Sequence, residues 1–156
     1  SELLRRLQDL TGAPVTSTLM GLGAFPADHP DWLGMLGMHG TFEANMAMNR
    51  CDVMVCIGAR FDDRVTGDPA KYATQAKVIH VEIDPAEIDK IIKADVAINS
   101  DAKVALQELI KKVKPSAHKD WVQEFKDCDE IEYQKVKEFD VIPNLPDGRQ
   151  ACFGIS

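Results

Sequence analysis

Charged residues and glycines gather where short apolar runs of the sequence end. The densest group is 58–67, where Arg60 and Arg64 stand beside acidic residues. Two arginines beside a strand end could grip a pyrophosphate or a substrate carboxylate in bidentate fashion, although alternating charges also form self-neutralising surface loops. Glu82 closes another apolar run, where a carboxylate could bind ribose hydroxyls or simply cap the chain. A nucleotide site is therefore one hypothesis for these loops.

The segment 37–40 places glycines and His39 directly before an expected helix. Glycine lets backbone N–H groups approach a phosphate at a helix start, but it is also an ordinary turn residue. His39 could stack on a flat ring, whereas His29, His80 and His118 are expected to be structural or surface residues. No carboxylate pair, Ser/His/Asp set or metal-ligand spacing stands out, so we predict no metal site and no catalytic machine within the chain.

A parallel sheet would bring these loops to one edge. The apolar runs 52–58 and 77–83 lack alternation, which predicts strands covered on both faces, and shorter strands are expected at 14–18, 34–37 and 96–98. The expected helices are 3–10 with Gly12 as a left-handed cap, 41–49, 69–74 weakly, 84–93 and 101–112. In the second of these, Phe42, Met46 and Met48 are expected to face the sheet. The alternation predicts an α/β, doubly wound, mostly parallel fold with ligands at the carboxyl ends of the strands.

Composition excludes several classes of partner. The 156 residues carry a net charge of -7, with scattered acidic residues that would repel phosphate backbones and anionic lipid. No run approaches the roughly 18 apolar residues of a membrane span. Free thiols are expected at Cys51, Cys56, Cys128 and Cys152, because their spacing fits neither a metal nor a redox motif. We therefore expect a soluble cytoplasmic protein that binds neither nucleic acid nor membrane.

Four blocks resemble the middle domain of acetolactate synthase (acetohydroxyacid synthase) catalytic subunits. They are 12–26, 34–40, 83–88 and the highly specific Gly-Ala-Arg-Phe-Asp-Asp-Arg-Val-Thr-Gly at 58–67. The resemblance covers about Ser1 to Val113. It implies a multidomain enzyme that uses thiamine diphosphate, magnesium and FAD to condense pyruvate with pyruvate or 2-ketobutyrate, on the way to branched-chain amino acids. It also implies a Rossmann-like, DHS-like NAD/FAD-binding domain, which in this family binds FAD.

The resemblance assigns FAD contacts to every strand end. By matching position, these contacts are Thr18, Leu19, Met20, Leu36, Gly37, Met38, His39, Gly58, Ala59, Arg60, Asp62, Arg64, Val65, Glu82, Ile83, Asp101 and Ala102. It further implies that Met38, Asp63 and Arg64 face the thiamine site, with Arg64 holding the second keto acid's carboxylate in a supporting role. The thiamine-activating carboxylate and the diphosphate and magnesium ligands belong to flanking domains, so we predict that this chain alone forms no acetolactate.

The resemblance also sets the expected organisation. We predict a central FAD-binding domain at 1–115, an amphipathic helix at 116–140 and a linker or disordered tail at 141–156. The domain is expected to be truncated at its N-terminal strand, which would weaken FAD binding, alter the sheet or leave a gap for a partner chain. Ser100 stands where the family usually has glycine, which puts close backbone contact with FAD in question there. Implied partners are the flanking domains, a small regulatory subunit and further copies in a homo-oligomer.

Two alternatives remain, one within the same superfamily and one from a different class of protein. One is the middle domain of another thiamine diphosphate enzyme, of the pyruvate oxidase or glyoxylate carboligase type, against which the blocks 38–40 and 60–64 argue. The other is a stand-alone nucleotide-binding scaffold whose polar strand ends act only as caps. A saturable change in flavin fluorescence on titration with FAD would separate a flavin-binding domain from such a scaffold.

Overall fold

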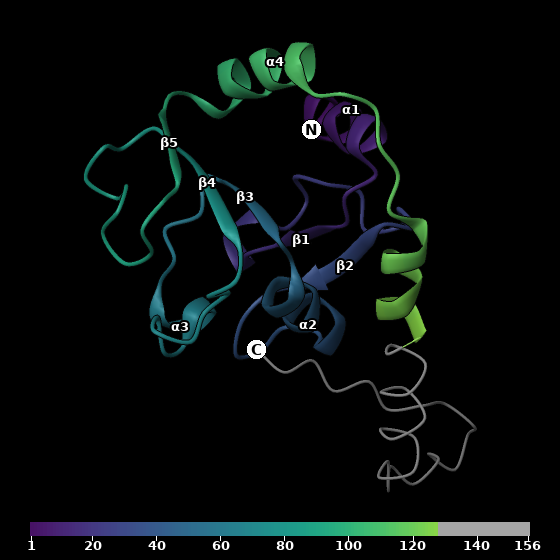
Figure 1. Cartoon of the computed structure of the whole chain (residues 1–156), viewed down its shortest axis with the longest axis horizontal. Helices are drawn as coiled ribbons and strands as arrows, with labels where there is room; N and C mark the ends of the chain where they lie inside the picture. Colours follow the sequence, from purple (N-terminus) through teal and green to yellow (C-terminus); the bar gives the residue numbers. More distant parts are fainter. Residues whose placement is uncertain (128–156) are drawn as a thin grey trace, which may run out of the picture.

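The computed structural model describes residues 1–127, so the second half of the helix expected at 116–140 and the tail expected at 141–156 lie outside the described residues. Strands and helices alternate along the chain (Figure 1). The elements are α1 (Glu2–Thr11), β1 (Val15–Ser17), the 3-10 helix η1 (Leu19–Gly21), β2 (Trp32–Met35), α2 (Phe42–Arg50), β3 (Val53–Ile57), α3 (Asp63–Thr66), β4 (Lys77–Glu82), β5 (Val96–Asn99) and α4 (Ala102–Lys112). A further helical segment occupies 119–127.

All strand pairs in the described part of the chain are parallel, which confirms the predicted α/β class. They form two sheets, β1-β2 and β3-β4-β5. In the larger sheet Val55 lies opposite Ile79, and Ile79 lies opposite Val96. The two sheets correct the expectation of one sheet, because within residues 1–127 no strand pairs with both β1 and β3.

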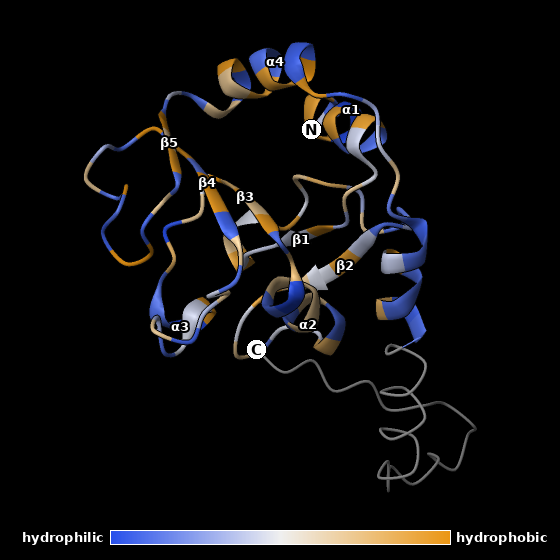
Figure 2. Ribbon diagram, in the orientation of Figure 1, coloured by the Kyte–Doolittle hydropathy of each residue, from blue (hydrophilic) through white to orange (hydrophobic). Residues whose placement is uncertain are grey.

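Helices flank the strands on two sides. Figure 1 shows α1 and α4 together on one side of the strands and α2 on the other. The central strand β4 is well covered although it carries polar residues, whereas Figure 2 shows β3 and β5 mostly in the orange of apolar residues. Val53, Val55 and Val96 nevertheless remain 51%, 45% and 49% exposed. The expectation of a strand covered on both faces is therefore wrong for β3, which is an outer strand of its sheet.

Two buried clusters hold the helices and loops onto the strands. The first contains Met48, Phe61, Tyr72, Ala73 and Val78. The second contains Leu33, Ala44, Ala47 and Phe125. α2 thus faces the core through its alanines and Met48. The expectation for Phe42 is wrong, since its side chain is 48% exposed.

Helix ends follow the predicted capping residues. Gly12 adopts the left-handed conformation after α1, with φ 63°. The Thr41 hydroxyl accepts a hydrogen bond from the N–H of Ala44, and the Asp101 carboxylate accepts from the N–H groups of Lys103 and Val104. These three contacts confirm the predicted helix boundaries, because each cap satisfies a backbone group that the helix itself leaves unpaired.

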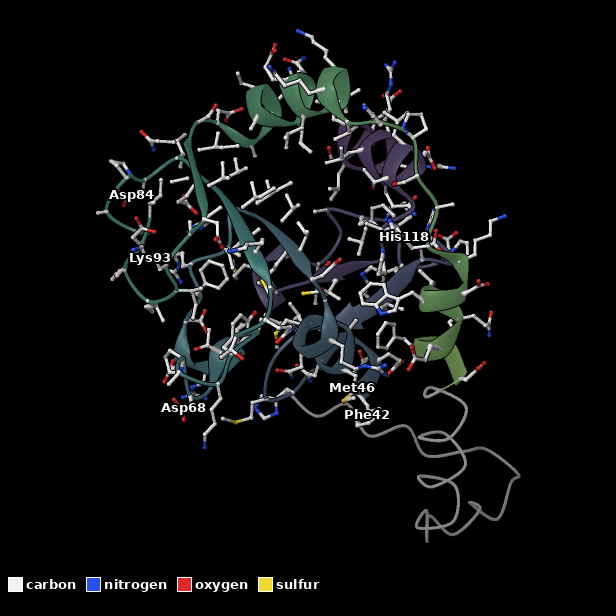
Figure 3. All side chains as sticks on the ribbon, in the orientation of Figure 1. Phe42, Met46, Asp68, Asp84, Lys93 and His118 are labelled. Atoms are coloured by element: carbon white, nitrogen blue, oxygen red, sulfur yellow. The ribbon has the colours of Figure 1, made fainter. Side chains whose placement is uncertain are left out.

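Two expected helices are absent from the described chain. Residues 69–74 and 84–93 form turns, and Figure 3 shows Asp84 and Lys93 in the loop between β4 and β5. Asp89 has a left-handed φ of 60°, and its carboxylate accepts a hydrogen bond from the N–H of Ala94 at 2.8 Å. Ala73 is also left-handed, with φ 43°. A positive φ inside the segment breaks helical hydrogen bonding, so both helix predictions are wrong.

The thiol of Cys56 is expected to react slowly in the folded chain. Cys51 and Cys56 are free thiols, as predicted, whereas Cys128 and Cys152 lie outside the described residues. Burial, with a smaller effect of Cys51, raises the pKa of Cys56 to about 12. At pH 8 we expect alkylation of Cys56 in the folded chain to be at least about 100-fold slower than in the unfolded chain, where the thiol pKa is about 8.5. Mass spectrometry of the peptide that contains Cys56 measures both rates.

The same pKa fixes the sign of an alkaline effect. A thiol whose folded pKa is raised stabilises the fold fully below the unfolded pKa, and that stabilisation is lost as pH rises toward the folded pKa. The free energy of unfolding should therefore fall between about pH 8.5 and about pH 12. Replacing Cys56 by valine should remove its share of this decline. Equal alkylation rates in the folded and unfolded chains would contradict the prediction.

Candidate functional site

The loops after β1, β2 and β3 are joined by backbone hydrogen bonds. The N–H of Leu36 donates to the carbonyl of Ser17 at 2.9 Å, so the ends of β1 and β2 lie side by side. The N–H of Met38 donates to the carbonyl of Arg64, also at 2.9 Å. Since β2 and β3 belong to different sheets, the bond between Met38 and Arg64 bridges the two sheets at their carboxyl ends.

The ends of β3, β4 and β5 are joined in the same way. The N–H of Gly58 donates to the carbonyl of Val81 at 2.8 Å, and the N–H of Ser100 donates to the carbonyl of Glu82 at 3.1 Å. The side-chain amide of Asn99 also donates to the Glu82 carbonyl, at 3.0 Å. Together with the contacts of Leu36 and Met38, these bonds connect all the loops that carry sequence-predicted site residues.

Exposed apolar side chains stand at several of these strand ends. Thr18 caps η1 by accepting a hydrogen bond from the N–H of Gly21. Leu19 and Met20 on η1 are 68% and 91% exposed, and Met38 after β2 is 69% exposed. Side chains of this size and exposure offer apolar surface that a flat ring system could cover. Sequence reasoning placed all of these residues at the site.

The loop after β2 comes very close to the segment that carries Arg64. Gly37 has φ 104°, and a Cβ atom there would lie 2.6 Å from the Arg64 carbonyl oxygen. Only glycine fits such a backbone position without displacing its neighbour. His39, two residues later, is exposed. Asn45 on α2 holds this loop by side-chain hydrogen bonds. Sequence reasoning missed this role, because no motif includes Asn45.

The charged segment after β3 is presented to solvent. The Asp62 carboxylate caps α3 by accepting a hydrogen bond from the N–H of Arg64 at 3.1 Å. Arg60 and Arg64 are exposed, and within residues 1–127 neither guanidinium forms an ion pair. The alternative of a self-neutralising loop is therefore not what the described chain forms. Both cations are available to an anion.

A cavity of about 380 Å³ opens beside Arg64. Its walls come from α2, α3 and the turn that follows α3, and they include Met38, Asp63, Arg64, Lys71 and Tyr72. Figure 3 shows Asp68, another lining residue, near α3 on the opposite side of the molecule from α4. The cavity combines cationic, anionic and apolar groups, as does a pocket for a small carboxylic acid.

The Glu82 carboxylate caps the end of its strand and also leaves one oxygen for a ligand, the two roles that the sequence left open. Its side chain belongs to a residue only 7% exposed, and Oε1 accepts hydrogen bonds from the N–H groups of Ile83 at 2.9 Å and Asp84 at 3.2 Å. The carboxylate therefore caps the end of β4. No group within residues 1–127 donates a hydrogen bond to Oε2, so that oxygen can accept one from a ligand. Ile83 is 66% exposed beside it.

The loop after β5 is largely committed to starting α4. Both hydrogen bonds of the Asp101 side chain go to N–H groups of that helix, and Ala102 is its first residue. The hydroxyl of Ser100 donates to the Asp101 carbonyl at 3.2 Å. A serine is therefore accommodated where the resemblance implies glycine. The remaining predicted residues Ala59 and Val65 are half-buried, and Val65 packs against the first core cluster.

The described residues contain neither a metal-binding cluster nor a membrane-spanning helix. No group of three or more His, Cys, Asp or Glu side chains in 1–127 could hold a metal ion. Among the helices of that part of the chain, none has the length and apolar character needed to cross a membrane.

Comparison with known proteins gives a consistent set of relatives. A family model described as thiamine pyrophosphate enzyme, central domain, matches residues 1–109. A probable acetolactate synthase large subunit of Methanocaldococcus jannaschii is 56% identical over 110 residues, which are 70% of this chain and 19% of that protein. The acetolactate synthase large subunit of Buchnera aphidicola subsp. Schizaphis graminum is 46% identical over 142 residues, 86% of this chain and 25% of the relative. The acetolactate synthase isozyme 3 large subunit of Escherichia coli is 46% identical over 128 residues, 78% and 22% respectively. The chain thus matches a quarter or less of each of these relatives.

Proposed function

This chain belongs to the family of thiamine pyrophosphate enzyme central domains, and from that premise we propose that it binds FAD across its strand ends as part of an acetolactate synthase large subunit. The parent enzyme would condense pyruvate with pyruvate or 2-ketobutyrate, with thiamine diphosphate and magnesium held by flanking domains. One observation carries the proposal. Hydrogen bonds link the loops after every strand and so gather apolar, cationic and carboxylate groups along one series of loops.

The residues at these loops fit the chemistry of FAD. The exposed side chains of Leu19, Met20 and Met38 can cover an apolar ring. Gly58 has no atom within 4 Å of the position that a Cβ would take, so its backbone is open to a pyrophosphate that Arg60 could neutralise. The free Oε2 of Glu82 can accept a hydrogen bond from a ribose hydroxyl. FAD would serve mainly to build the site, since the condensation transfers no net electrons.

Arg64 is proposed to orient the second keto acid. Its guanidinium is exposed, lines the 380 Å³ cavity and forms no ion pair within the described residues. The planar fork of arginine matches a carboxylate through two parallel hydrogen bonds. Asp63 and Met38 border the same cavity and would shape the space around the acid. The bond-making groups would come from the flanking domains, so this chain only positions and encloses the substrate.

The names of the relatives also guide the choice of enzyme and partners. All those compared are acetolactate synthases, which favours this enzyme over the pyruvate oxidase and glyoxylate carboligase alternatives. A protein called a large subunit implies a small one, and we propose a small regulatory subunit and further copies of the large subunit as partners.

The free thiols of Cys51 and Cys56 agree with the reducing cytoplasm predicted from the sequence.

FAD titration of the purified chain tests the proposal. We expect a saturable change in flavin fluorescence. Replacing Glu82 by glutamine should raise the Kd for FAD about tenfold, because a charge-assisted hydrogen bond to the cofactor becomes a neutral one. The amide oxygen of glutamine can still cap the end of β4, so the fold should be retained.

The matched control is Glu108→Gln on α4. Glu108 pairs with Lys111 at 2.6 Å on an exposed surface, and its loss should leave the Kd for FAD unchanged. Absence of any saturable change in the wild-type chain would instead support the scaffold alternative. The chain alone should form no acetolactate, and turnover by the pure chain would contradict the division of roles between domains.

A further inference from the structure

The side chain of Asn45 clamps the backbone of the loop after β2. Its Oδ1 accepts a hydrogen bond from the N–H of Gly37 at 3.0 Å, and its Nδ2 donates to the carbonyl of Gly37 at 3.0 Å. The same Nδ2 donates to the carbonyl of Thr41 at 3.0 Å. One amide therefore bonds both backbone groups of Gly37, because it carries an acceptor and a donor together, and the Gly37 carbonyl also accepts from the N–H of Gly40 at 2.9 Å.

The clamped residue controls the bridge between the two sheets. Gly37 has φ 104°, and its Cα lies so close to the Arg64 carbonyl that an added Cβ would be 2.6 Å from that oxygen. The next residue, Met38, makes the bridging hydrogen bond to the same carbonyl at 2.9 Å. Rotation of the Gly37 backbone would move the Met38 N–H away from Arg64. The orientation of Gly37 thus sets the distance between the loops that carry Met38 and Arg64.

Asn45 is attached to a fixed part of the molecule. It lies on α2, whose neighbouring residues Ala44 and Ala47 are 0% and 4% exposed in the second core cluster. The start of that helix is held as well, because the Thr41 hydroxyl donates to the carbonyl of Leu33 at 2.6 Å. A side chain on a packed helix transmits the position of the core to a loop more precisely than contacts within the loop can.

We propose that Asn45 is a positioning residue that sets the placement of Met38 against Arg64, and through it the geometry of the flavin and keto-acid site. The inference rests on the proposed function for its consequence, but its geometric part concerns only this chain. Asn45 also lines the cavity beside Arg64, but its positioning role requires no contact with cofactor or substrate. It acts through Gly37, and asparagine is required because the clamp uses one acceptor and a donor group that serves two carbonyls.

Amide hydrogen exchange on the full chain tests the geometric part. In Asn45→Ala, exchange at the Gly37 and Met38 amides should become at least tenfold faster, while the Gly58 amide, bonded to Val81, keeps its rate. In Asn45→Asp, Gly37 N–H keeps an acceptor, while the Gly37 and Thr41 carbonyls lose the side-chain amide and keep their backbone donors, the N–H groups of Gly40 and Asn45, so the increase should be smaller. The matched control is Asn49→Ala, one turn later on α2, where the lost bond to the Asn45 carbonyl is exposed and the clamp stays intact. Asn49 lines the same cavity as Asn45, so this variant also shows the effect of losing an asparagine from the cavity wall alone.

FAD titration of the same variants tests the consequence. We expect the Kd for FAD to rise about tenfold in Asn45→Ala, with circular dichroism showing that the chain stays folded. Unchanged exchange at Gly37 and Met38 overturns the proposal, and so does faster exchange without loss of FAD affinity. If the wild-type chain binds no FAD, the proposed function fails instead, and the exchange rates still decide whether Asn45 positions the loop. If Asn45→Ala unfolds, the comparison of Asn45→Asp with Asn49→Ala decides in its place.

Discussion

Replacing Arg64 by alanine in the full-length enzyme is expected to lower kcat/KM for the keto-acid condensation about 100-fold. The variant would lose the proposed hydrogen bonds between the guanidinium and the carboxylate of the second keto acid, and hydrogen bonds between charged groups contribute about 1.5 to 3 kcal/mol each. Arg64→Lys should recover only part of the loss, because an ammonium cannot make the paired contact of the guanidinium. Steady-state kinetics with pyruvate alone and with 2-ketobutyrate measure the effect.

Lys71 supplies the control for that experiment. It lines the same cavity, is strongly exposed, and its amine lies 3.6 Å from the Asp68 carboxylate. Removing its charge tests whether general cationic character of the cavity, rather than the guanidinium, holds the acid. A large loss in Lys71→Ala together with a small loss in Arg64→Ala would contradict the assigned role. The backbone carbonyl of Arg64 is kept in every variant, so the bridge to Met38 should persist.

Phe125→Ala is expected to destabilise the chain by about 3–5 kcal/mol, the usual result of truncating a buried phenylalanine. Its ring is 0% exposed and lies at 90° to the ring of Trp121, with 4.8 Å between centroids. The guanidinium of Arg50 on α2 lies 5.7 Å from the same ring. The loss would be a large part of the 5 to 15 kcal/mol that typically stabilises a domain. Urea unfolding followed by tryptophan fluorescence gives the free energy.

Val104→Ala is the control for this truncation. Val104 lies on α4 and is 52% exposed, so the free energy of unfolding should change by less than about 0.5 kcal/mol. If Phe125→Ala changed it equally little, the helical segment 119–127 would not share the cooperative unit formed by the strands. The expected result instead makes this segment part of the folded unit, held to α2 through the second core cluster.

Local signals in the sequence were sufficient for much of the fold. The strands β3 and β4 are short apolar runs bounded by polar residues, and Gly12, Thr41 and Asp101 mark helix ends by their own chemistry. The helix predicted at 84–93 was wrong because Asp84 and the proline after it resemble the start of a helix. The left-handed Asp89 and its hydrogen bond to Ala94 form turns there instead. No pattern of residues in this segment indicates that turns are favoured over a helix.

The candidate site was predictable to a similar extent. Charged and glycine residues at strand ends identified the loops, because parallel strands deliver their carboxyl ends to the same edge. What joins the loops was not predictable. The contacts of Asn45 with Gly37 and of Asn99 with Glu82 link residues through side-chain amides, and neither asparagine lies in a motif. The role of Glu82 was not predictable either, because it depends on which carboxylate oxygen accepts the backbone hydrogen bonds, and both go to Oε1.

The uncovered flank of β3 has a consequence for the chain in concentrated solution. Within the described residues β3 pairs only with β4, and Val53 and Val55 are about half exposed beside its open side. Free backbone N–H and C=O groups next to β-branched side chains form a template onto which a strand of another molecule can add. Molecules that stack in this way would grow into fibrils or precipitate. A charged substitution at Val53 would oppose the addition of another strand, because a charge at this exposed position is unfavourable in a stacked sheet.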